Sequence, residues 1–342
     1  MTENDRIVLA VDIGGTKIAV AAITTTGSML GRIIEPTHQN GPKSGIDQII
    51  AILDTLIHQF DIPTKLIIGI GIGIPAVLEK DTDFIIWGPN LQGWKNVDLR
   101  APLEDHFKLP VAVEYDGHTA VLGEWWMGAA KDYQSIVSII IGTGVGGGMV
   151  LEGNLIRGKN RLAGAVGWFI LDRTAEIDPS HERSLGSWEA RIAGVGIARQ
   201  ANQSLEAQAT IPSVLRSKMG LVTAKDVFEA AKKGDLLAIQ IASDEAVLIG
   251  MGIANIVSLV NPEIVILGGS VGANAAFLLP QIKTVVEQYA QPISSQSVQI
   301  VTSQLGTDAG LFGAAYGIML RLMKTETKYL KGGSNIVHSV IN

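Results

Sequence analysis

The stretch that most constrains this chain is Asp12-Ile13-Gly14-Gly15-Thr16-Lys17, close to its start. Apolar runs flank it at residues 7–11 and 18–23, and both have the composition of buried β-strands. A phosphate-binding P-loop would place the glycines between a strand and a helix. Here they join two strands, so the sequence predicts a β-hairpin with glycine at its tip.

The residue types at this tip suit a phosphate and its cation. Gly14 and Gly15 can adopt positive φ and let backbone N–H groups come close to an anion. Thr16 adds a hydroxyl donor and Lys17 a positive charge, while Asp12 can hold a hydrated Mg²⁺. An ordinary Gly-Gly turn is the alternative interpretation, because such turns are common in hairpins.

The plan of the first two strands returns at residue 136. Residues 136–141 form an apolar run, Gly142-Thr143-Gly144-Val145-Gly146-Gly147-Gly148 is rich in glycine, and a second apolar run ends at Leu151. A dinucleotide-binding fingerprint would need a helix after the glycines, whereas a strand follows here. We therefore predict a second phosphate-binding hairpin, with Thr143 and Gly144 at the nucleotide. A turn that serves packing only is the alternative.

The rest of the pattern predicts an α/β protein. Further strands are expected at 29–35, 66–74, 111–113, 263–267 and 298–301, and helices at 45–60, 117–130, 187–203, 223–233, 235–260, 274–290 and 307–323. The repeated plan favours two similar α/β units around a cleft. We assign residues 1–120 and 307–325 to a smaller unit, residues 121–306 to a larger one, and residues 326–342 to a C-terminal extension.

A third glycine-containing stretch, Gly268-Gly269-Ser270-Val271, follows the predicted strand at 263–267. Glycines at the end of a strand in an open α/β sheet often let a ligand approach. Gly268, Gly269 and Ser270 are therefore candidates for the adenosine site, with a simple strand-to-helix turn as the alternative.

Asp116 is the candidate general base. It lies just past the predicted strand at 111–113, in Glu114-Tyr115-Asp116-Gly117-His118. Phosphoryl transfer depends mostly on positioning and electrostatics, with one carboxylate to accept the proton of the attacking hydroxyl. A helix N-cap is the alternative role for Asp116, because aspartate is favoured there. Glu114 and Glu124 are the nearest rivals for the base.

Composition narrows the class of protein. The chain has 342 residues, of which 47% are hydrophobic and 18% charged, so it can bury a large core. Its net charge of −6 argues against a nucleic-acid-binding surface. It has no cysteine, and hence no disulfide and no thiolate metal site. Without an apolar signal region or an uninterrupted apolar run of membrane-spanning length, we expect a cytoplasmic protein that does not enter a membrane.

Aromatic and histidine side chains give weaker signals. Indole rings suit sugar rings, so we expect at most two of the six tryptophans to contact substrate and the others to pack in the core. The tryptophans are Trp87, Trp94, Trp125, Trp126, Trp168 and Trp188. His181 lacks the cysteine partners of a zinc site and is expected in a surface loop.

Taken together, these motifs resemble those of the ROK family (repressors, open reading frames, sugar kinases), over roughly residues 6–323. The segments that carry the resemblance are Asp12–Lys17, Pro89-Asn90-Leu91-Gln92-Gly93-Trp94, Asp116 with Ala120, Gly123 and Glu124, the glycines from Gly142 to Gly148, and Gly186-Ser187-Trp188-Glu189-Ala190. The resemblance implies two RNase H-like domains of the actin/hexokinase type around a central cleft. It also implies a homodimer or homotetramer.

The same resemblance implies ATP and Mg²⁺, and transfer of the γ-phosphate to a sugar hydroxyl, usually the 6-hydroxyl. Asp116 falls on the family's catalytic base, and Asn90 and Glu189 fall on residues that contact the sugar or support its site. The implied partner is therefore a small carbohydrate or cyclitol, with no nucleic acid.

The chain departs from the family at the acceptor. Tyr115 stands where Asn usually precedes the base, and Ala165-Val166-Gly167-Trp168 stands where Glu-x-Gly-His is usual. Residues 180–187 replace the family's cysteine cluster, so we expect no zinc site. Hydroxyl-binding groups are lost while the nucleotide motifs remain, so we expect an acceptor other than plain glucose, contacted by Tyr115 and Trp168.

Two other functions stay open. Family repressors carry a DNA-binding segment before this core, which the acidic charge and the position of Asp12 disfavour here. A catalytically silent protein that binds a sugar or nucleotide is the second, because Tyr115 and Ala165 lie where substrate is expected.

Overall fold

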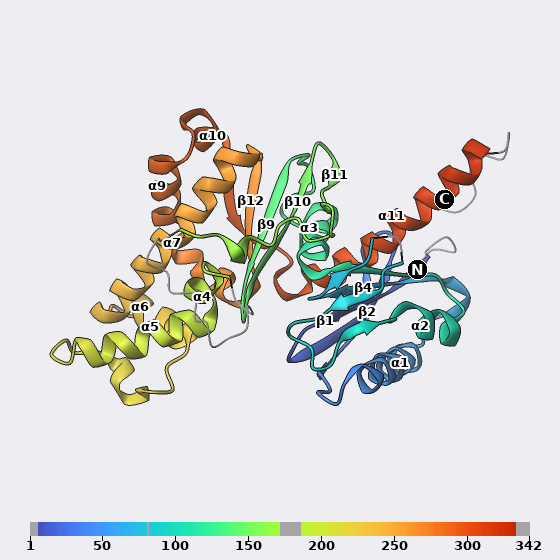
Figure 1. The fold of residues 1–342 in the computed structure, drawn as a ribbon, viewed down its shortest axis with the longest axis horizontal. Helices are drawn as coiled ribbons and strands as arrows, with labels where there is room; N and C mark the ends of the chain where they lie inside the picture. Colours follow the sequence, from blue (N-terminus) through green and yellow to red (C-terminus); the bar gives the residue numbers. More distant parts are fainter. Residues whose placement is uncertain (1–5, 81, 172–185, 333–342) are drawn as a thin grey trace. The chain divides into compact units, whose positions relative to one another are not determined.

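The computed structural model describes residues 6–80, 82–171 and 186–332 of the chain. Contacts divide the chain into two compact units, each shown in Figure 1. The first unit comprises Met1–Lys131, Leu155–Ala163 and Asp308–Asn342, and the second comprises Asp132–Asn154 and Gly164–Thr307. Relative to the ranges expected from sequence, the first unit also takes in residues 121–131, 155–163 and 326–342, while residue 307 falls in the second unit.

The first unit is built on a five-stranded sheet with the order β3-β2-β1-β4-β8. β1 pairs antiparallel with β2 and parallel with β4, and β8 extends the parallel side. The strands are β1 (Ile7–Ile13), β2 (Lys17–Thr24), β3 (Met29–Pro36), β4 (Ile67–Ile74) and β8 (Val111–Tyr115). The predicted hairpin and its neighbouring strands are thus confirmed.

Helices cover both faces of this sheet (Figure 1). Strand side chains alternate between the faces, so Leu9 packs under α1 (Pro42–Gln59) and α2 (Arg100–Phe107), whereas Ala10 packs under α11 (Ala309–Gly332). A 3₁₀ turn at Thr64–Leu66 precedes β4, and a small sheet of β5 (Val77–Leu78), β6 (Ile85–Trp87) and β7 (Lys95–Val97) follows it. The small sheet was not predicted.

The backbones of helices α3 (Asp116–Met127) and α11 approach closely where each helix carries a glycine, and aromatic side chains of the two helices pack against each other further along. A β-carbon on Gly123 would collide with the carbonyl of Ala309, and one on Gly313 with the carbonyl of Thr119. This close approach fixes the start of α3, where Asp116 lies, against the start of α11.

The second unit repeats the plan of the first with the strand order β11-β10-β9-β12-β13. β9 pairs antiparallel with β10 and parallel with β12, which pairs parallel with β13. The strands are β9 (Ile136–Ile141), β10 (Val145–Leu151), β11 (Asn154–Leu155), β12 (Ile264–Gly268) and β13 (Gln299–Thr302). The predicted repeat is therefore confirmed, and the strand after the glycines excludes the dinucleotide fingerprint.

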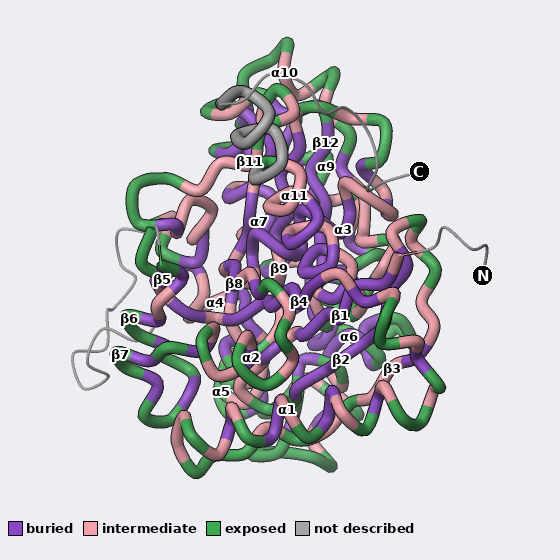
Figure 2. Tube along the Cα trace, turned by 90° about the vertical axis from the view of Figure 1, so that its right-hand side faces the viewer, coloured by how far each residue is buried: buried purple, intermediate pink, exposed green. Residues whose placement is uncertain are grey.

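In the second unit, the hydrophobic core lies between one face of the sheet and a group of helices. Its helices are α4 (Glu189–Ile192), α5 (Gly194–Ala207), α6 (Ala224–Lys232), α7 (Leu236–Val260), α8 (Gly269–Asn274), α9 (Leu279–Tyr289) and α10 (Pro292–Ser297), with 3₁₀ turns at Val166–Trp168, Val214–Lys218, Ala275–Leu278 and Gly306–Asp308. Figure 2 shows β9, β12 and much of α7 as buried chain. By length and composition α7 could cross a bilayer, but 56% of its most apolar window is buried, as in the core helix of a globular unit.

Two helix predictions need correction. The helix expected at 187–203 breaks at Ala193, because the Gly194 N–H donates to the carbonyl of Gly142 at 2.8 Å instead of continuing the helix. The last helix, expected to end near residue 323, runs as α11 to Gly332 and takes in the start of the predicted C-terminal extension.

Candidate active site

The first hairpin turns its carbonyl groups toward the segment that follows β3. The carbonyl of Gly14 accepts from Thr37 Oγ1 at 2.7 Å, and that of Gly15 accepts from Gln39 Nε2 at 2.8 Å. The carbonyl of Thr16 accepts from the Thr37 N–H at 3.1 Å. In a trans peptide the N–H points opposite to the preceding C=O. The amides of residues 15–17 therefore face away from this segment, as an anion-binding turn requires.

The glycines of this tip are needed for space and not for positive φ. Neither Gly14 nor Gly15 adopts positive φ, so the conformational role suggested by the sequence is not used. A β-carbon on Gly15 would lie 3.0 Å from the carbonyl oxygen of Asn90. The exposed Asn90 is thereby placed against the hairpin tip.

Three carboxylates lie within electrostatic range at the base of the hairpin. The Asp12 carboxyl packs on the first turn of α11, where a β-carbon on Gly310 would lie 2.7 Å from it. Burial, followed by the repulsion of Asp116 and Asp308, raises the pKa of Asp12 to about 7 against the opposing charge of Lys17. The residue as a whole keeps some exposed surface, while its carboxyl is covered.

This arrangement fits a hydrated divalent cation. A cation would relieve the repulsion that holds the pKa of Asp12 high, and Mg²⁺ usually binds one or two carboxylates while keeping several waters. Among the residues that the structure describes, no three His, Asp or Glu side chains converge as a metal cage. Most of the 180–187 segment, including His181, lies outside the described residues.

Asp116 is the first residue of α3, and Tyr115 is the N-cap. The Asp116 carboxylate accepts the N–H of Gly117 at 2.8 Å and is partly exposed. Its two rivals are buried and engaged elsewhere. Glu124 accepts the Ala129 N–H at 2.8 Å, and Glu114 is paired with arginines. Asp116 is thus the carboxylate of the three best placed to meet a ligand.

The second hairpin carries Glu189 against its glycines. The Val145 N–H donates to Glu189 Oε2 at 2.6 Å, and a β-carbon on Gly144 would lie 2.7 Å from the same oxygen. Burial raises the pKa of Glu189, and the bond from Val145 opposes that rise. Thr143 is exposed at the tip. The structure therefore brings together two predicted nucleotide residues and one predicted acceptor residue.

The third glycine stretch lies beside the second hairpin. Gly268 ends β12 and Gly269 begins α8 with a φ of 77°, so this is the strand-to-helix turn that was the alternative interpretation. The nearest atom to a β-carbon on Gly142 would be the Ser270 Oγ, 3.8 Å away. The adenosine role of this turn stays a prediction.

The segment Ala165–Trp168 adjoins the same hairpin. Gly167 packs directly on the carbonyl of Val145, and the following Trp168 is 56% exposed. Trp94 and Trp188 are buried, as the packing interpretation expects, whereas Trp87 is exposed. Among the tryptophans, Trp168 is thus placed next to predicted site residues with its indole accessible.

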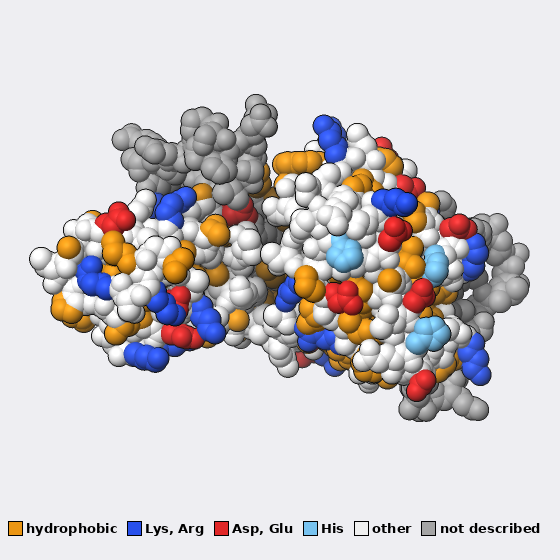
Figure 3. All heavy atoms as spheres, turned by 90° about the horizontal axis from the view of Figure 1, so that it is seen from below, with side chains coloured by type: hydrophobic (Ala, Val, Ile, Leu, Met, Phe, Trp, Pro, Cys, Tyr) orange, Lys and Arg blue, Asp and Glu red, His pale blue; other side chains and the backbone are white. Residues whose placement is uncertain are grey.

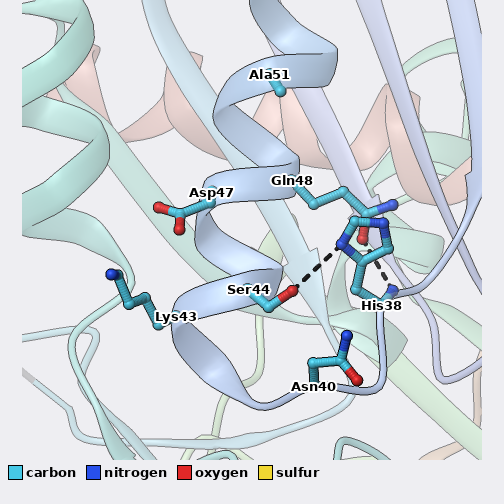
Figure 4. A pocket seen from close by; sticks show the side chains of 7 residues that line it. All are labelled: His38, Asn40, Lys43, Ser44, Asp47, Gln48 and Ala51. Atoms are coloured by element: carbon cyan, nitrogen blue, oxygen red, sulfur yellow. Dashed lines mark hydrogen bonds between the residues drawn. The ribbon is translucent and has the colours of Figure 1, made fainter.

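A surface hollow on α1 is separate from the predicted residues (Figure 4). In it, Ser44 Oγ and His38 Nδ1 lie 3.3 Å apart, and the backbone N–H of His38 donates to Gln48 Oε1 at 2.9 Å. Its lining consists of His38, Asn40, Lys43, Ser44, Asp47, Gln48 and Ala51. On the face seen in Figure 3, basic and acidic side chains are intermixed. Neither observation suggests another reactive centre.

Sequence reasoning missed several residues that shape the site. Thr37 and Gln39 orient the first hairpin, and Asp308 and Gly310 adjoin Asp12. Asp308 also pairs with Arg32 at 2.9 Å. An Asp-Ala-Gly sequence at a predicted helix start was the available signal for the second pair, but only the fold brings it to Asp12.

The model of the ROK family matches residues 8–319. The chain belongs to the ROK family. It is 35% identical to a glucokinase of Halalkalibacterium halodurans over 97% of this chain and 99% of that one. It is also similar to the structure of a ROK family glucokinase from Streptomyces griseus in complex with glucose and AMPPNP, with a TM-score of 0.77 and 27% identity over 90% of this chain and 98% of that chain.

Regulators also occur among the ROK relatives of this chain. A xylose repressor of Bacillus spizizenii is 24% identical over 89% of this chain and 75% of that protein. The fold is the mixed α/β fold of ROK sugar kinases, of the actin/hexokinase-like type. ROK membership thus confirms the predicted fold and family. Because the relatives include both kinases and a repressor, the activity must be inferred from the site residues.

Proposed function

We propose that this protein transfers the γ-phosphate of ATP to a hydroxyl, the 6-hydroxyl, of a sugar or sugar-like acceptor. The observation that carries the proposal is the grouping of Asp12, Asp116 and Asp308 beside a hairpin whose amides face away from its supporting segment. Such a turn suits phosphate, and such carboxylates suit a cation and a proton.

Each unit supplies part of the nucleotide site in this proposal. Asp12 would hold Mg²⁺ through water, and Gly14, Gly15, Thr16 and Lys17 would bind phosphate. From the second unit, Thr143 and Gly144 would bind phosphate, and Gly268, Gly269 and Ser270 the adenosine. When bound, Mg²⁺ neutralises phosphate charge. The glucokinase complex with AMPPNP supports the use of ATP.

Asp116 would accept the proton of the attacking hydroxyl. Its place at the first residue of α3, held by the close crossing with α11, would fix it relative to Asp12. Such positioning, and not strong basicity, is what phosphoryl transfer requires.

The acceptor would contact Asn90, Tyr115, Trp168 and Glu189. Ala165 cannot hydrogen-bond through its side chain, and Trp168 offers an exposed indole face. A site that discriminates by pairing hydroxyls rejects analogues strongly, whereas an apolar face discriminates weakly. We therefore propose an acceptor other than plain glucose, such as a modified sugar, aminosugar, glycoside or cyclitol.

A silent sugar- or nucleotide-binding protein, or a regulator, is the second candidate. The repressors among the relatives support it, and so does the loss of polar side chains at residues 165 and 168. The intact set of Asp12, Asp116 and both hairpins favours the kinase.

A coupled assay of ADP release separates these candidates. MgATP would be offered with glucose, N-acetylglucosamine, glucosamine, methyl glucoside and myo-inositol, each against an acceptor-free control. Acceptor-dependent release establishes the kinase. Efficient use of glucose above all others rejects the acceptor proposal, and no release with any compound rejects kinase activity in favour of binding.

A further inference from the structure

A short part of the chain leaves the second unit and belongs to the first. Residues 155–163, here called the crossing segment, belong to the first unit, although residues 132–154 and 164–307 belong to the second. The crossing segment ends at Ala163, directly before the stretch Gly164–Trp168 that we propose as part of the acceptor site. Whatever fixes the crossing segment therefore also fixes the start of that stretch.

Two side chains fix the crossing segment to Glu114, two residues before Asp116. Arg157 Nε donates to Glu114 Oε2 at 2.7 Å. His118 bridges Glu114 Oε1, at 3.1 Å from its Nδ1, and the carbonyl of Ala163, at 2.9 Å from its Nε2. Burial would raise the pKa of Glu114, but the bond with His118 and the charges of Arg157 and Arg161 hold it well below its usual range.

Arg161 makes the most extensive contacts of the crossing segment. Its Nη1 donates to Asp83 Oδ1 at 2.6 Å, and its Nη2 donates to Glu114 Oε1 at 3.1 Å and to the carbonyl of Val113 at 2.9 Å. It is 6% exposed. One guanidinium thus joins the loop before β6 to the strand β8 that ends next to Asp116.

This pair is held at a cost. Arg161 has a φ of 55° and Asp83 a φ of 61°, so both ends of the buried ion pair adopt the left-handed conformation that disfavours residues with a side chain. Such a conformation is unfavourable for a residue with a side chain, and burying both charges adds a desolvation penalty. Strain of this kind persists where the surroundings enforce it, and it is concentrated at functional sites.

We propose that Arg161 is a positioning residue for phosphoryl transfer, and this role rests on the kinase activity proposed above. By binding Asp83, Glu114 and the Val113 carbonyl, it fastens the crossing segment to β8. The stretch Gly164–Trp168 would then begin at a fixed place relative to Asp116, so that an acceptor bound there presents its hydroxyl to the base. Arg161 does not itself touch the reacting atoms.

Arg161→Gly tests this role without adding backbone strain, because glycine accepts a φ of 55°. The steady-state KM for the best acceptor of the panel should rise at least about tenfold, while the KM for ATP changes less than about twofold. Arg161→Lys keeps one positive charge but not the fork, so it should recover part of the loss. Hydrogen exchange of the amides at 164–168 should quicken in Arg161→Gly without any ligand.

Arg216→Gly is the matched control. Arg216 lies in the second unit and donates to the carbonyls of Leu205, Gln208 and Ile211, so its loss removes a comparable set of bonds. It should lower stability without separating the two KM values. Equal changes in both KM values for Arg161→Gly, or unchanged exchange at 164–168, would overturn the positioning role. A wild-type protein that is silent toward every acceptor would instead overturn the proposed function on which it rests.

Discussion

The two units share one strand order but differ in how they hold charge. The hairpin of the first unit adjoins Asp12, Asp116 and Asp308. Burial, followed by the repulsion of Asp116 and Asp308, raises the pKa of Asp12 to about 7. The hairpin of the second unit adjoins the carboxylate of Glu189, which accepts a hydrogen bond from the Val145 N–H. The same framework is thus used once to gather charge and once to shape a glycine-rich surface.

A buried glutamate in each unit shows the same difference. Glu114 of the first unit is 6% exposed and is paired with Arg157, Arg161 and His118. Glu245 of the second unit is fully buried, and neither of its carboxyl oxygens has a hydrogen-bond partner among the described residues. The first carboxylate is stabilised as an ion, while the second is stable only when it carries its proton.

This contrast suggests a division of labour. In the proposed function, cation binding and proton transfer fall to the first unit. The second unit would contribute backbone, glycine and aromatic surface for phosphate, adenosine and acceptor. Substitutions of charge should therefore have their largest functional effects in the first unit, and substitutions of shape in the second.

The largest expected effect comes from Asp116→Asn. The amide keeps the shape of the side chain but cannot accept the proton, so kcat should fall by roughly 10²–10⁴. Nucleotide binding, measured by calorimetry with MgAMPPNP, should change little because the hairpin is untouched. Asp98→Asn is the control, since Asp98 also accepts N–H groups at a helix start, from Arg100 at 3.0 Å. Full activity in Asp116→Asn would remove it as the base.

Asp12→Asn should lower the activity of the protein but raise its stability. Loss of the cation-holding charge should lower kcat by at least about 100-fold. The pKa of Asp12 is raised in the folded state, so its ionised form opposes folding above pH 7. Without Mg²⁺ at pH 8 the variant should therefore be more stable by about 1–3 kcal/mol, after discounting for partial exposure.

Chemical denaturation with EDTA measures the stability gain of Asp12→Asn. Asp47→Asn on the exposed side of α1 provides the reference, because Asp47 is exposed. A gain no larger than that of the reference would mean that burial and repulsion do not destabilise the ionised Asp12 carboxylate in the folded protein. The assignment of ionic chemistry to the first hairpin would then lose its main support.

Local pattern was enough to predict much of the framework. Apolar runs and glycines predicted β1, β2, β9 and β10, and the Asn261-Pro262 pair predicted the end of α7. The break at Ala193 was not predictable in this way, because it depends on a bond from Gly194 to Gly142, more than fifty residues earlier. Local sequence pattern therefore predicts the bounds of an element correctly only where no distant residue forms hydrogen bonds with its backbone.

The site shows the same limit. Residue types predicted Asp12 and Asp116, and the fold brings their charges together. Positive φ at Gly14 and Gly15 was wrong as an expectation, because the tip needs space for the Asn90 carbonyl instead. Arg161 had no local signal, since its bonds are to Asp83 in the loop before β6 and to Glu114 in β8, both distant in the sequence. Side chains that act through the fold are the ones that sequence pattern misses.

A smaller effect, on stability alone, is expected for Glu245→Gln. Burial raises the pKa of Glu245 to about 8, and the repulsion of Asp244 adds to this effect. The positive charge of Arg191 acts in the opposite direction. Between about pH 4.5 and 8 the folded state holds a proton that the unfolded state has lost. Wild-type stability should thus fall by roughly 1.4 kcal/mol per pH unit more than that of the variant.

Urea denaturation at half-unit steps from pH 5.5 to 9 tests this slope. The difference between Glu245→Gln and the wild type should grow up to about pH 8 and then level off. Glu206→Gln, on the exposed side of α5, should give a curve parallel to the wild type. A pH-independent difference for Glu245→Gln would show that this carboxyl is ionised in the folded protein, and the contrast with Glu114 would disappear.

The smallest expected effect concerns shape in the second hairpin. In Gly144→Ala the new β-carbon would lie 2.7 Å from Glu189 Oε2, so the carboxylate must move off the Val145 N–H. Because the end of a flexible side chain can move, stability should fall by less than about 1 kcal/mol. In Gly142→Ala the nearest atom is 3.8 Å away, and neither glycine has positive φ, so this control should be nearly neutral in stability.

The KM for the acceptor should rise severalfold in Gly144→Ala, and this rise should vanish in a Glu189→Ala background. If it persists there, the alanine acts on phosphate binding directly, and the second unit shapes the nucleotide site without involving Glu189.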